Sequence, residues 1–432
     1  MNEKLLDFIY RSPSPFHAVE NCANELKEAG YTEIFENSGF DVSYGGKYFV
    51  RRNMSSLIAF RLPEKAFDGF MIMAAHSDSP SFKIKEKPGV KAAGVYAQLN
   101  TEKYGGMICS SWMDRPLSAA GRVIVKNGDR LETKLVNIDK DLLLIPNVAI
   151  HMDRSMNEGK NYNANIDMLP LMGSEKLADG VEAIVANWAG CEKDSIVSTD
   201  LFLYPRCKGR VWGAEDEYIC SPRLDDLQCV FGCMQGLINS KGSDSASVLC
   251  VFDNEEVGSG TKQGADSSFL EDVLFRCCEA LGLNSSEYRR KLANSFMVSA
   301  DNAHAVHPNH PEYADRNDRP EMNKGIVIKF NANQRYTTDA VSAAVFGEIC
   351  IRAGVPTQRL SNRADIQGGS TLGNISSSHV AVNSVDIGLP QLAMHSVMET
   401  AGAKDTEYLV KAAEKFYDSS LEIKGGIVEI KA

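Results

Sequence analysis

Two adjacent glutamates, Glu255 and Glu256, follow an apolar run in the stretch VFDNEEVGSG at residues 251–260. Neighbouring carboxylates repel each other, so a pair placed where a buried strand is predicted to end needs a chemical reason. Consecutive side chains point in different directions, so one carboxylate can bind a metal ion while the other accepts a proton from water. The glycines that follow allow the backbone to turn away tightly. The stretch therefore indicates metal-assisted hydrolysis, with the two roles open between the two residues.

Other segments have the same layout, in which an apolar run is followed by side chains that can bind metal. They supply His76 and Asp78 after MIMAA, Asp301, His304 and His307 in FMVSADNAHAVH, and His395 after LPQLAM, while SPRLDD adds Asp225 and Asp226 at a predicted helix start. If the runs are parallel strands, these side chains emerge at the carboxyl ends, where open α/β sheets build their sites. A single Asp or His is more often a cap or a core group, but the repetition favours a functional cluster.

The donor set is rich in carboxylates, contains isolated histidines and has no C-x-x-C pair. Such donors predict a catalytic centre of the zinc class, of the two-metal kind in which one carboxylate bridges the ions, and manganese and cobalt suit the same ligands. Asp78 lies two residues after His76, on the same side of an extended chain, so it can orient the imidazole. His304 and His307 have the H-x-x-H spacing of a rival metal site, but their surroundings are typical of a loop.

The elements that would hold these residues alternate between apolar strands and amphipathic helices. Residues 4–30 are predicted to be helical, residues 47–62 to form strands and residues 69–80 to contain a strand buried on both faces. After residue 222 strand and helix patterns alternate, which predicts a parallel, doubly wound sheet. From about 90 to 220 the pattern is mostly β, with one helical patch near 176–188. We therefore expect an α/β domain of residues 1–90 and 222–432, interrupted by an inserted β-rich domain of residues 91–221.

Composition excludes several classes of protein. The chain has 432 residues and a formal net charge of −11, which argues against binding to nucleic acid. The 11 cysteines are scattered, several within apolar runs, as expected in a reducing compartment. The N-terminus lacks the basic region and cleavage site of a signal peptide, and no apolar stretch reaches the ~18 residues of a membrane span. We expect a soluble, cytoplasmic protein.

Five motifs, AAHSDSP, SPRLDD, DNEEVGS, SADNAHAVHPN and QLAMHS, resemble in their order and span the aspartyl-aminopeptidase-like family of dinuclear zinc aminopeptidases, peptidase family M18. The likeness covers nearly the whole chain, including SPSPFHAVENCANELKEAGY and NQRY at 333–336. It implies a zinc-exopeptidase-like α/β domain with an inserted dimerisation domain, usually assembled as a homo-oligomer, a tetrahedral dodecamer. It also implies an enzyme that removes one residue from peptides with a free N-terminus.

The resemblance assigns a role to each matching residue. The implied ligands are His76 and Asp301 for one metal ion, Glu256 and His395 for the other, and Asp225 between the two ions. Glu255 would be the general base and Asp78 would support His76. Asp226, which stands where relatives often have Asn, would have no ligand role.

The resemblance leaves the preferred first residue of the substrate open. In acid-preferring members a lysine, a tyrosine and a histidine form the side-chain pocket, matching Lys329, Tyr336 and His304, whereas some relatives prefer neutral or basic residues. A histidine of the inserted domain, matching His151, would reach the site of a neighbouring subunit.

Three alternatives remain open. The same metal centre would serve a deacylase or a carboxypeptidase, and the fold could persist in a non-catalytic assembly or cargo-binding protein. A serine hydrolase is disfavoured because the chain has no G-x-S-x-G elbow. The complete donor set and the presence of Glu255 argue against a non-catalytic protein, and the family resemblance alone favours an aminopeptidase over the other two hydrolases.

Overall fold

A nine-stranded mixed sheet forms the centre of the larger part of the molecule. The computed structural model describes residues 1–366, 368, 369 and 371–431. In spatial order the strands are β1 (Thr32–Ile34), β2 (Lys47–Arg52), β3 (Ser56–Arg61), β13 (Ala246–Phe252), β4 (Phe70–His76), β14 (Phe296–Ala300), β18 (Asn383–Gly388), β16 (Ile326–Phe330) and β17 (Thr357–Ser361). Every residue of β4 and β13 is buried, as their continuous apolar runs predict.

The middle of this sheet is parallel, and antiparallel pairs lie on either side. β13, β4, β14 and β18 run parallel to one another, whereas β3 is antiparallel to β13 and β16 is antiparallel to β18. The sequence pattern predicts a parallel sheet, and the structure departs from it at these two pairs and at the antiparallel pair of β2 and β3. One cause is local: β2 and β3 form a hairpin through a tight turn in which Asn53 and Met54 adopt positive φ angles.

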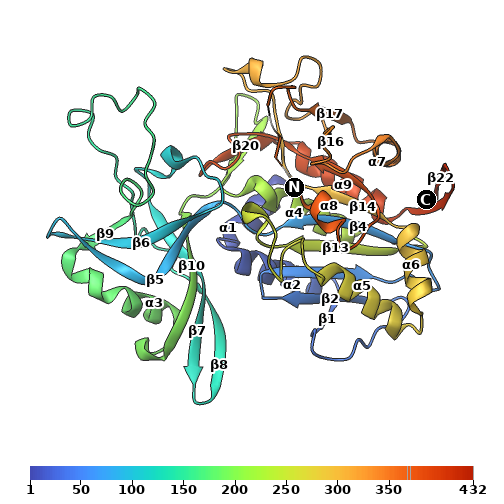
Figure 1. The fold of residues 1–432 in the computed structure, drawn as a ribbon, viewed down its shortest axis with the longest axis horizontal. Helices are drawn as coiled ribbons and strands as arrows, with labels where there is room; N and C mark the ends of the chain where they lie inside the picture. The colour runs from blue at the N-terminus through green and yellow to red at the C-terminus, as the bar shows by residue number, and fades with distance from the viewer. Residues whose placement is uncertain (367, 370, 432) are drawn as a thin grey trace.

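Helices cover both faces of the sheet, as a doubly wound fold requires (Figure 1). Met71, Met73 and Ala75 of β4 belong to one core with α1 (Asn2–Arg11), α2 (Pro15–Glu28), α4 (Leu224–Asn239), α7 (Ala340–Ala353) and α9 (Asp405–Tyr417). Phe70 and Ile72, which point the other way, pack with α5 (Phe269–Ala280), near α6 (Ser285–Ala293) and α8 (Leu372–Ser376). The period-2 alternation of β4 therefore serves two separate cores.

A six-stranded antiparallel sheet forms the other lobe, on the left in Figure 1. Its order is β8 (Arg130–Asn137), β7 (Leu117–Asn127), β10 (Ile196–Pro205), β5 (Ser81–Ala92), β6 (Tyr96–Tyr104) and β9 (Leu171–Ser174). It has its own hydrophobic core, which includes Phe82 and Trp112. The helical patch expected near 176–188 is a 3-10 turn (Glu175–Gly180) followed by α3 (Val181–Ala189).

Two smaller sheets complete the chain. A five-stranded sheet has the order β11 (Arg210–Trp212), β12 (Tyr218–Ser221), β20 (Glu399–Gly402), β19 (Pro390–Leu392) and β15 (Ala303–His304), and β21 (Ser420–Lys424) pairs with β22 (Ile427–Lys431). No helix in the described part of the chain is both long and apolar enough to cross a membrane.

Candidate metal centre

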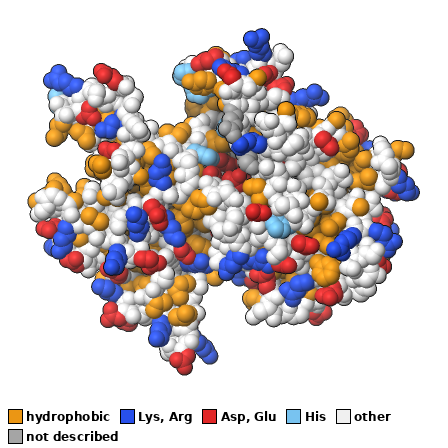
Figure 2. Space-filling view, in the orientation of Figure 1, with side chains coloured by type: hydrophobic (Ala, Val, Ile, Leu, Met, Phe, Trp, Pro, Cys, Tyr) orange, Lys and Arg blue, Asp and Glu red, His pale blue; other side chains and the backbone are white. Residues whose placement is uncertain are grey.

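The candidate centre lies where neighbouring strands of the nine-stranded sheet end. His76 is the last residue of β4, Asp301 directly follows β14, and the 3-10 turn Glu255–Val257 follows β13. Because these strands are adjacent and parallel, their carboxyl ends meet at one edge of the sheet. Figure 2 shows carboxylates and histidine atoms in a hollow near the middle of this face.

Two residues reach the centre from outside the strand ends. Asp225 comes from the first turn of α4, and His395 comes from the loop between β19 and β20. The sequence pattern places His395 at the end of a strand of the main sheet. In the structure the strand before it, β19, belongs to the five-stranded sheet, although β19 directly continues the course of β18.

Among the described residues, three groups of donor atoms can hold a cation. Within each group, all donor atoms lie within 4.8 Å of one another. The groups are His76 with Asp225, Asp226 and Asp301; His76 with Glu255 and Glu256; and Asp225 with Glu256 and His395. Asp225 belongs to two of these groups. Its Oδ2 lies 3.2 Å from His395 Nε2, and its Oδ1 lies 3.7 Å from His76 Nε2. The structure therefore places every residue that the family resemblance implies as a ligand in at least one of these groups.

Burial makes this centre electrostatically unfavourable without added positive charge. Burial raises the pKa of Glu255 to about 8, with Asp301 and Glu256 adding repulsion, and raises the pKa of Glu256 to about 7. Burial also raises the pKa of Asp301 to about 6, against the attraction of Lys329. Burial lowers the pKa of His395, but contact with Asp225 and Glu256 outweighs burial and raises it to about 11. Carboxylates in this setting favour any cation that can enter.

The donor atoms fit divalent metal ions. Asp225 Oδ1 is buried and has no hydrogen-bond partner among the described residues, and neither does Asp226 Oδ1. An unpaired buried carboxylate oxygen is costly unless a cation coordinates it. Imidazole nitrogens together with carboxylate oxygens are ligands that zinc accepts. Asp226 Oδ2 also accepts the backbone N–H of His76, at 3.0 Å.

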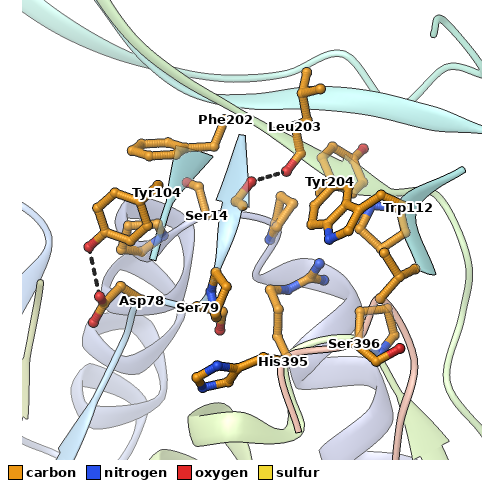
Figure 3. Close-up of a pocket in the computed structure, with 18 of the residues that line it drawn as sticks. Ser14, Asp78, Ser79, Tyr104, Trp112, Phe202, Leu203, Tyr204, His395 and Ser396 are labelled. Carbon is orange, nitrogen blue, oxygen red and sulfur yellow. Dashed lines mark hydrogen bonds between the residues drawn. The ribbon is translucent and has the colours of Figure 1, made fainter. Parts of the chain in front are cut away.

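Asp78 supports both sides of the centre. Its carboxylate accepts the backbone N–H groups of Glu255 and Glu256, each at 3.2 Å, and lies 3.4 Å from His76 Nδ1. His76 Nδ1 is also 3.0 Å from the carbonyl oxygen of Asp78. The same carboxylate accepts the hydroxyl of Tyr104 at 2.7 Å, as the dashed line in Figure 3 shows. Asp78 therefore ties His76 to the turn that carries both glutamates.

Sequence reasoning missed three groups that hold the ligands in place. Glu399, which is 2% exposed, accepts the backbone N–H of His395 at 2.7 Å and that of Asp225 at 2.9 Å. The carbonyl oxygen of Gly106 lies 2.6 Å from His395 Nδ1, and Tyr104 bonds Asp78. These contacts involve backbone atoms or a distant strand, so no spacing in the sequence signals them. The lone glutamate in SVMETAG was the one hint available.

The substrate-pocket candidates lie in different places. Lys329 is buried, donates to the carbonyl oxygen of Asn302 at 2.9 Å and lies 3.6 Å from Asp301 Oδ2. Its Nζ is 5.5 Å from the centre of the Tyr336 ring. Burial lowers the pKa of His304, and the charge of Lys329 lowers it further, so the imidazole is neutral near pH 7.

His151 and His307 stand apart from this cluster. His151 is exposed, in the long segment between β8 and β9 that extends from the six-stranded sheet in Figure 1. His304 and His307 belong to none of the donor groups found in the described part of the chain. His307 instead lies against His310, with ring centres 5.3 Å apart. The rival H-x-x-H metal site therefore gains no support.

Comparison with known proteins identifies close relatives. The family model described as "Aminopeptidase I zinc metalloprotease (M18)" matches residues 8–417. A protein of Clostridium acetobutylicum described as "Probable M18 family aminopeptidase 2" is 48% identical over 424 residues, covering 96% of this chain and 98% of the relative. A protein of Clostridium novyi with the same description is 45% identical over 423 residues, with the same coverage.

Solved structures show the same fold. One described as "Cryo-EM structure of the Ape4 and Nbr1 complex" has a TM-score of 0.93 and 39% identity, covering 96% of this chain and 84% of that chain. Another, "Structure of S. cerevesiae mApe1 dodecamer", has a TM-score of 0.85 and 28% identity, covering 96% and 95%. These likenesses confirm the α/β fold and the family resemblance predicted from the five motifs. The chain belongs to the M18 family of zinc metalloproteases, and its activity is that of a metal-dependent aminopeptidase.

Proposed function

We propose that this aminopeptidase releases the N-terminal residue of peptides by attack of a water molecule, with Glu255 as the general base and Glu256 as a metal ligand. The observation that carries the proposal is the different placement of the two glutamates. Glu256 shares a donor group with Asp225 and His395, whereas Glu255 shares one only with His76 and Glu256. Glu256 thus belongs to two donor groups, and Glu255 belongs to only one of them.

The proposed ligands are those that the donor groups bring together. His76 and Asp301 would hold one divalent ion, Glu256 and His395 a second, and Asp225 would bridge them. Zinc is the expected metal because the family is one of zinc metalloproteases. When bound, such ions polarise a carbonyl group and increase the acidity of water.

The protein's own groups then move the protons. Glu255 accepts a proton from the attacking water and passes it to the leaving amine, so it must be ionised at the start of the reaction. In the metal-free centre burial and neighbouring carboxylates raise its pKa, and cations at the neighbouring donors would oppose that shift and favour the ionised form. The hydrogen bond from its own backbone N–H to Asp78 fixes the turn on which it lies. Asp78 therefore positions the base without contacting the substrate.

A pocket for an acidic first residue is a finer proposal. Lys329 is a buried cation within the apolar strand β16 and lies next to Tyr336, which comes six residues after the strand ends. Lys329 donates one hydrogen bond to Asn302, which leaves further N–H donors for a substrate carboxylate. Neutral His304 can add a donor. Together these groups favour N-terminal Asp or Glu.

We further propose that the chain acts as a homo-oligomer. The solved S. cerevesiae relative is described as a dodecamer. In this chain the segment around His151 exposes Val148, Ile150, Met152 and Ile166, and an apolar cluster of this kind favours burial against another subunit. In such an assembly His151 would reach the site of a neighbour. The inserted domain of residues 91–221 would supply this contact, while residues 1–90 and 222–432 carry the metals.

A cytoplasmic location fits the state of the thiols. Each of the 11 cysteines, all of them in the described part of the chain, is unpaired. Unpaired cysteines are typical of proteins in a reducing compartment.

A substrate panel separates the proposed activity from the alternatives. The purified, zinc-loaded protein is offered peptides with a free N-terminal Asp, Leu or Lys, and the same peptides with an acetylated N-terminus. We expect release of the free first residue, fastest for Asp, and no cleavage of the acetylated set. Cleavage of acetylated peptides, or release from the C-terminus, would instead identify a deacylase or a carboxypeptidase.

A further inference from the structure

A narrow cavity lies between the two lobes, behind His395 and Asp78. Its walls come from the α1–α2 loop, from β10 of the six-stranded sheet and from the segments before α4 and around His395. Figure 3 shows Phe202, Leu203 and Tyr204 along one side and His395 along the other. The space open to the centres of water-sized spheres is about 40 Å³, which is room for one to about three water-sized species.

Two side chains that line this cavity have buried polar atoms without a partner among the residues that the structure describes. They are Arg223, through Nε and Nη1, and Trp112, through Nε1. Arg223 Nη2 donates to the carbonyl oxygen of Ile9 at 3.1 Å, and no carboxylate of the described residues lies within 4.0 Å of the guanidinium. Trp112 is 3% exposed, and Figure 3 shows its indole nitrogen facing the interior of the cavity.

All three unpartnered atoms are donors. Guanidinium and indole N–H groups cannot accept a hydrogen bond, so only an acceptor satisfies them. The guanidinium also brings a positive charge that no neighbouring carboxylate neutralises. Two carboxylates, Glu399 and Asp78, also line the cavity. Glu399 already accepts the backbone N–H groups of Asp225 and His395, and Asp78 accepts those of Glu255 and Glu256. A water molecule can accept hydrogen bonds from these groups, but it brings no negative charge to offset the guanidinium.

We propose that this cavity binds a small monovalent anion of halide size, held by Arg223 and Trp112. The cavity volume is too small for a phosphate-bearing metabolite and suits chloride. The anion would join the two lobes, because Trp112 ends the 3-10 turn Cys109–Trp112 that follows β6, whereas Arg223 immediately precedes α4. It would also fix the turn that leads to Asp225, two residues further on.

Diffraction from the unmodified protein gives the direct test. Crystals grown in sodium bromide, and in sodium gluconate as the halide-free reference, are measured at the bromine absorption edge. We expect an anomalous peak within hydrogen-bond distance of Arg223 and Trp112 Nε1. A cavity filled by water alone, or an anomalous signal confined to the surface, overturns the proposal.

A solution measurement uses matched variants. At constant ionic strength, replacing gluconate by chloride should raise the melting temperature with a saturable dependence. Trp112→Phe and Arg223→Gln should weaken the apparent chloride affinity about tenfold or more, whereas Trp188→Phe and Arg210→Gln, which alter exposed side chains outside the cavity, should leave it unchanged. If Arg223→Gln fails to fold, Trp112→Phe decides. An unchanged chloride response in Trp112→Phe contradicts the site.

Discussion

The hydroxyl of Tyr104 donates to Asp78 Oδ2 over 2.7 Å, so the last residue of β6 contacts the carboxylate on which the catalytic turn rests. Asn254 Nδ2 donates to the same hydroxyl at 2.8 Å. The six-stranded sheet is therefore linked to the metal centre by a side chain, and Gly106 adds a second link through His395. A change in the contact between the two lobes would therefore shift both Asp78 and His395.

Tyr104→Phe tests this link. The variant removes a hydrogen bond to a buried carboxylate, which is worth about 1.5–3 kcal/mol. We expect kcat to fall about 10- to 100-fold with little change in KM and with the bound metal retained. Tyr96→Phe, an exposed tyrosine on the same strand, is the control. Wild-type kcat in Tyr104→Phe would show that the contact does not matter for catalysis.

Glu399→Gln tests the positioning of two ligands by one carboxylate. An amide offers a single acceptor oxygen, so either His395 or Asp225 must lose the partner of its backbone N–H. We expect metal affinity to fall about 10- to 100-fold, measured by competition with a chelator. Glu407→Gln on the exposed side of α9 should bind metal like the unmodified protein. Equal affinities for both variants would remove Glu399 from the account.

The metal-free protein should lose stability as pH rises. The pKa values of Glu255, Glu256 and Asp301 in the folded state, about 8, 7 and 6, exceed those of free carboxyl groups. The folded state therefore binds more protons than the unfolded state between about pH 4.5 and 8, and the free energy of unfolding falls across that range. His395, with a raised pKa of about 11, acts in the same direction above pH 6.5.

Thermal melts of chelator-treated and metal-loaded protein from pH 5 to 8 measure this effect. We expect the melting temperature of the metal-free form to fall steadily, while that of the loaded form changes little because the ions compensate the carboxylates. If the melting temperatures of the two forms change with pH in the same way, the carboxylates at this centre do not cause the loss of stability.

Lys329→Met tests the acidic pocket. Removing one partner of a buried charge pair costs about 2–5 kcal/mol, so kcat/KM for an N-terminal Asp substrate should fall at least about 30-fold relative to a Leu substrate. The ratio is the readout because Lys329 also contacts Asn302 and Asp301, so its loss can affect all substrates. Lys324→Met, exposed before β16, should keep the ratio. A preserved ratio in Lys329→Met would place acid recognition elsewhere.

Much of the centre could be predicted because the physics that builds it is local in the sequence. β4, β13 and β14 are buried on both faces, so they appear as continuous apolar runs, and their ligands lie at or within a few residues of the strand ends. The direction of the outer strands could not be predicted, since β16 looks like β14 in composition but pairs antiparallel with β18.

The groups that hold the ligands in place, Glu399, Gly106 and Tyr104, could not be predicted from the sequence for another reason. Glu399 acts on backbone N–H groups, and Gly106 acts through its own carbonyl oxygen. Every residue has such groups, so neither contact requires a recognisable partner type. Tyr104 is separated from Asp78 by 26 positions and by the whole of β5, and only the fold shows that they meet.

One paired measurement distinguishes the proposed role of Glu255 as general base from that of Glu256 as metal ligand. Metal content and turnover are determined side by side for Glu255→Gln and Glu256→Gln after equal loading with zinc. We expect Glu255→Gln to keep its metal while turnover falls about 10²- to 10⁴-fold. We expect Glu256→Gln to lose metal together with activity. Near-native turnover in Glu255→Gln, or loss of metal from it with retention in Glu256→Gln, would contradict the account.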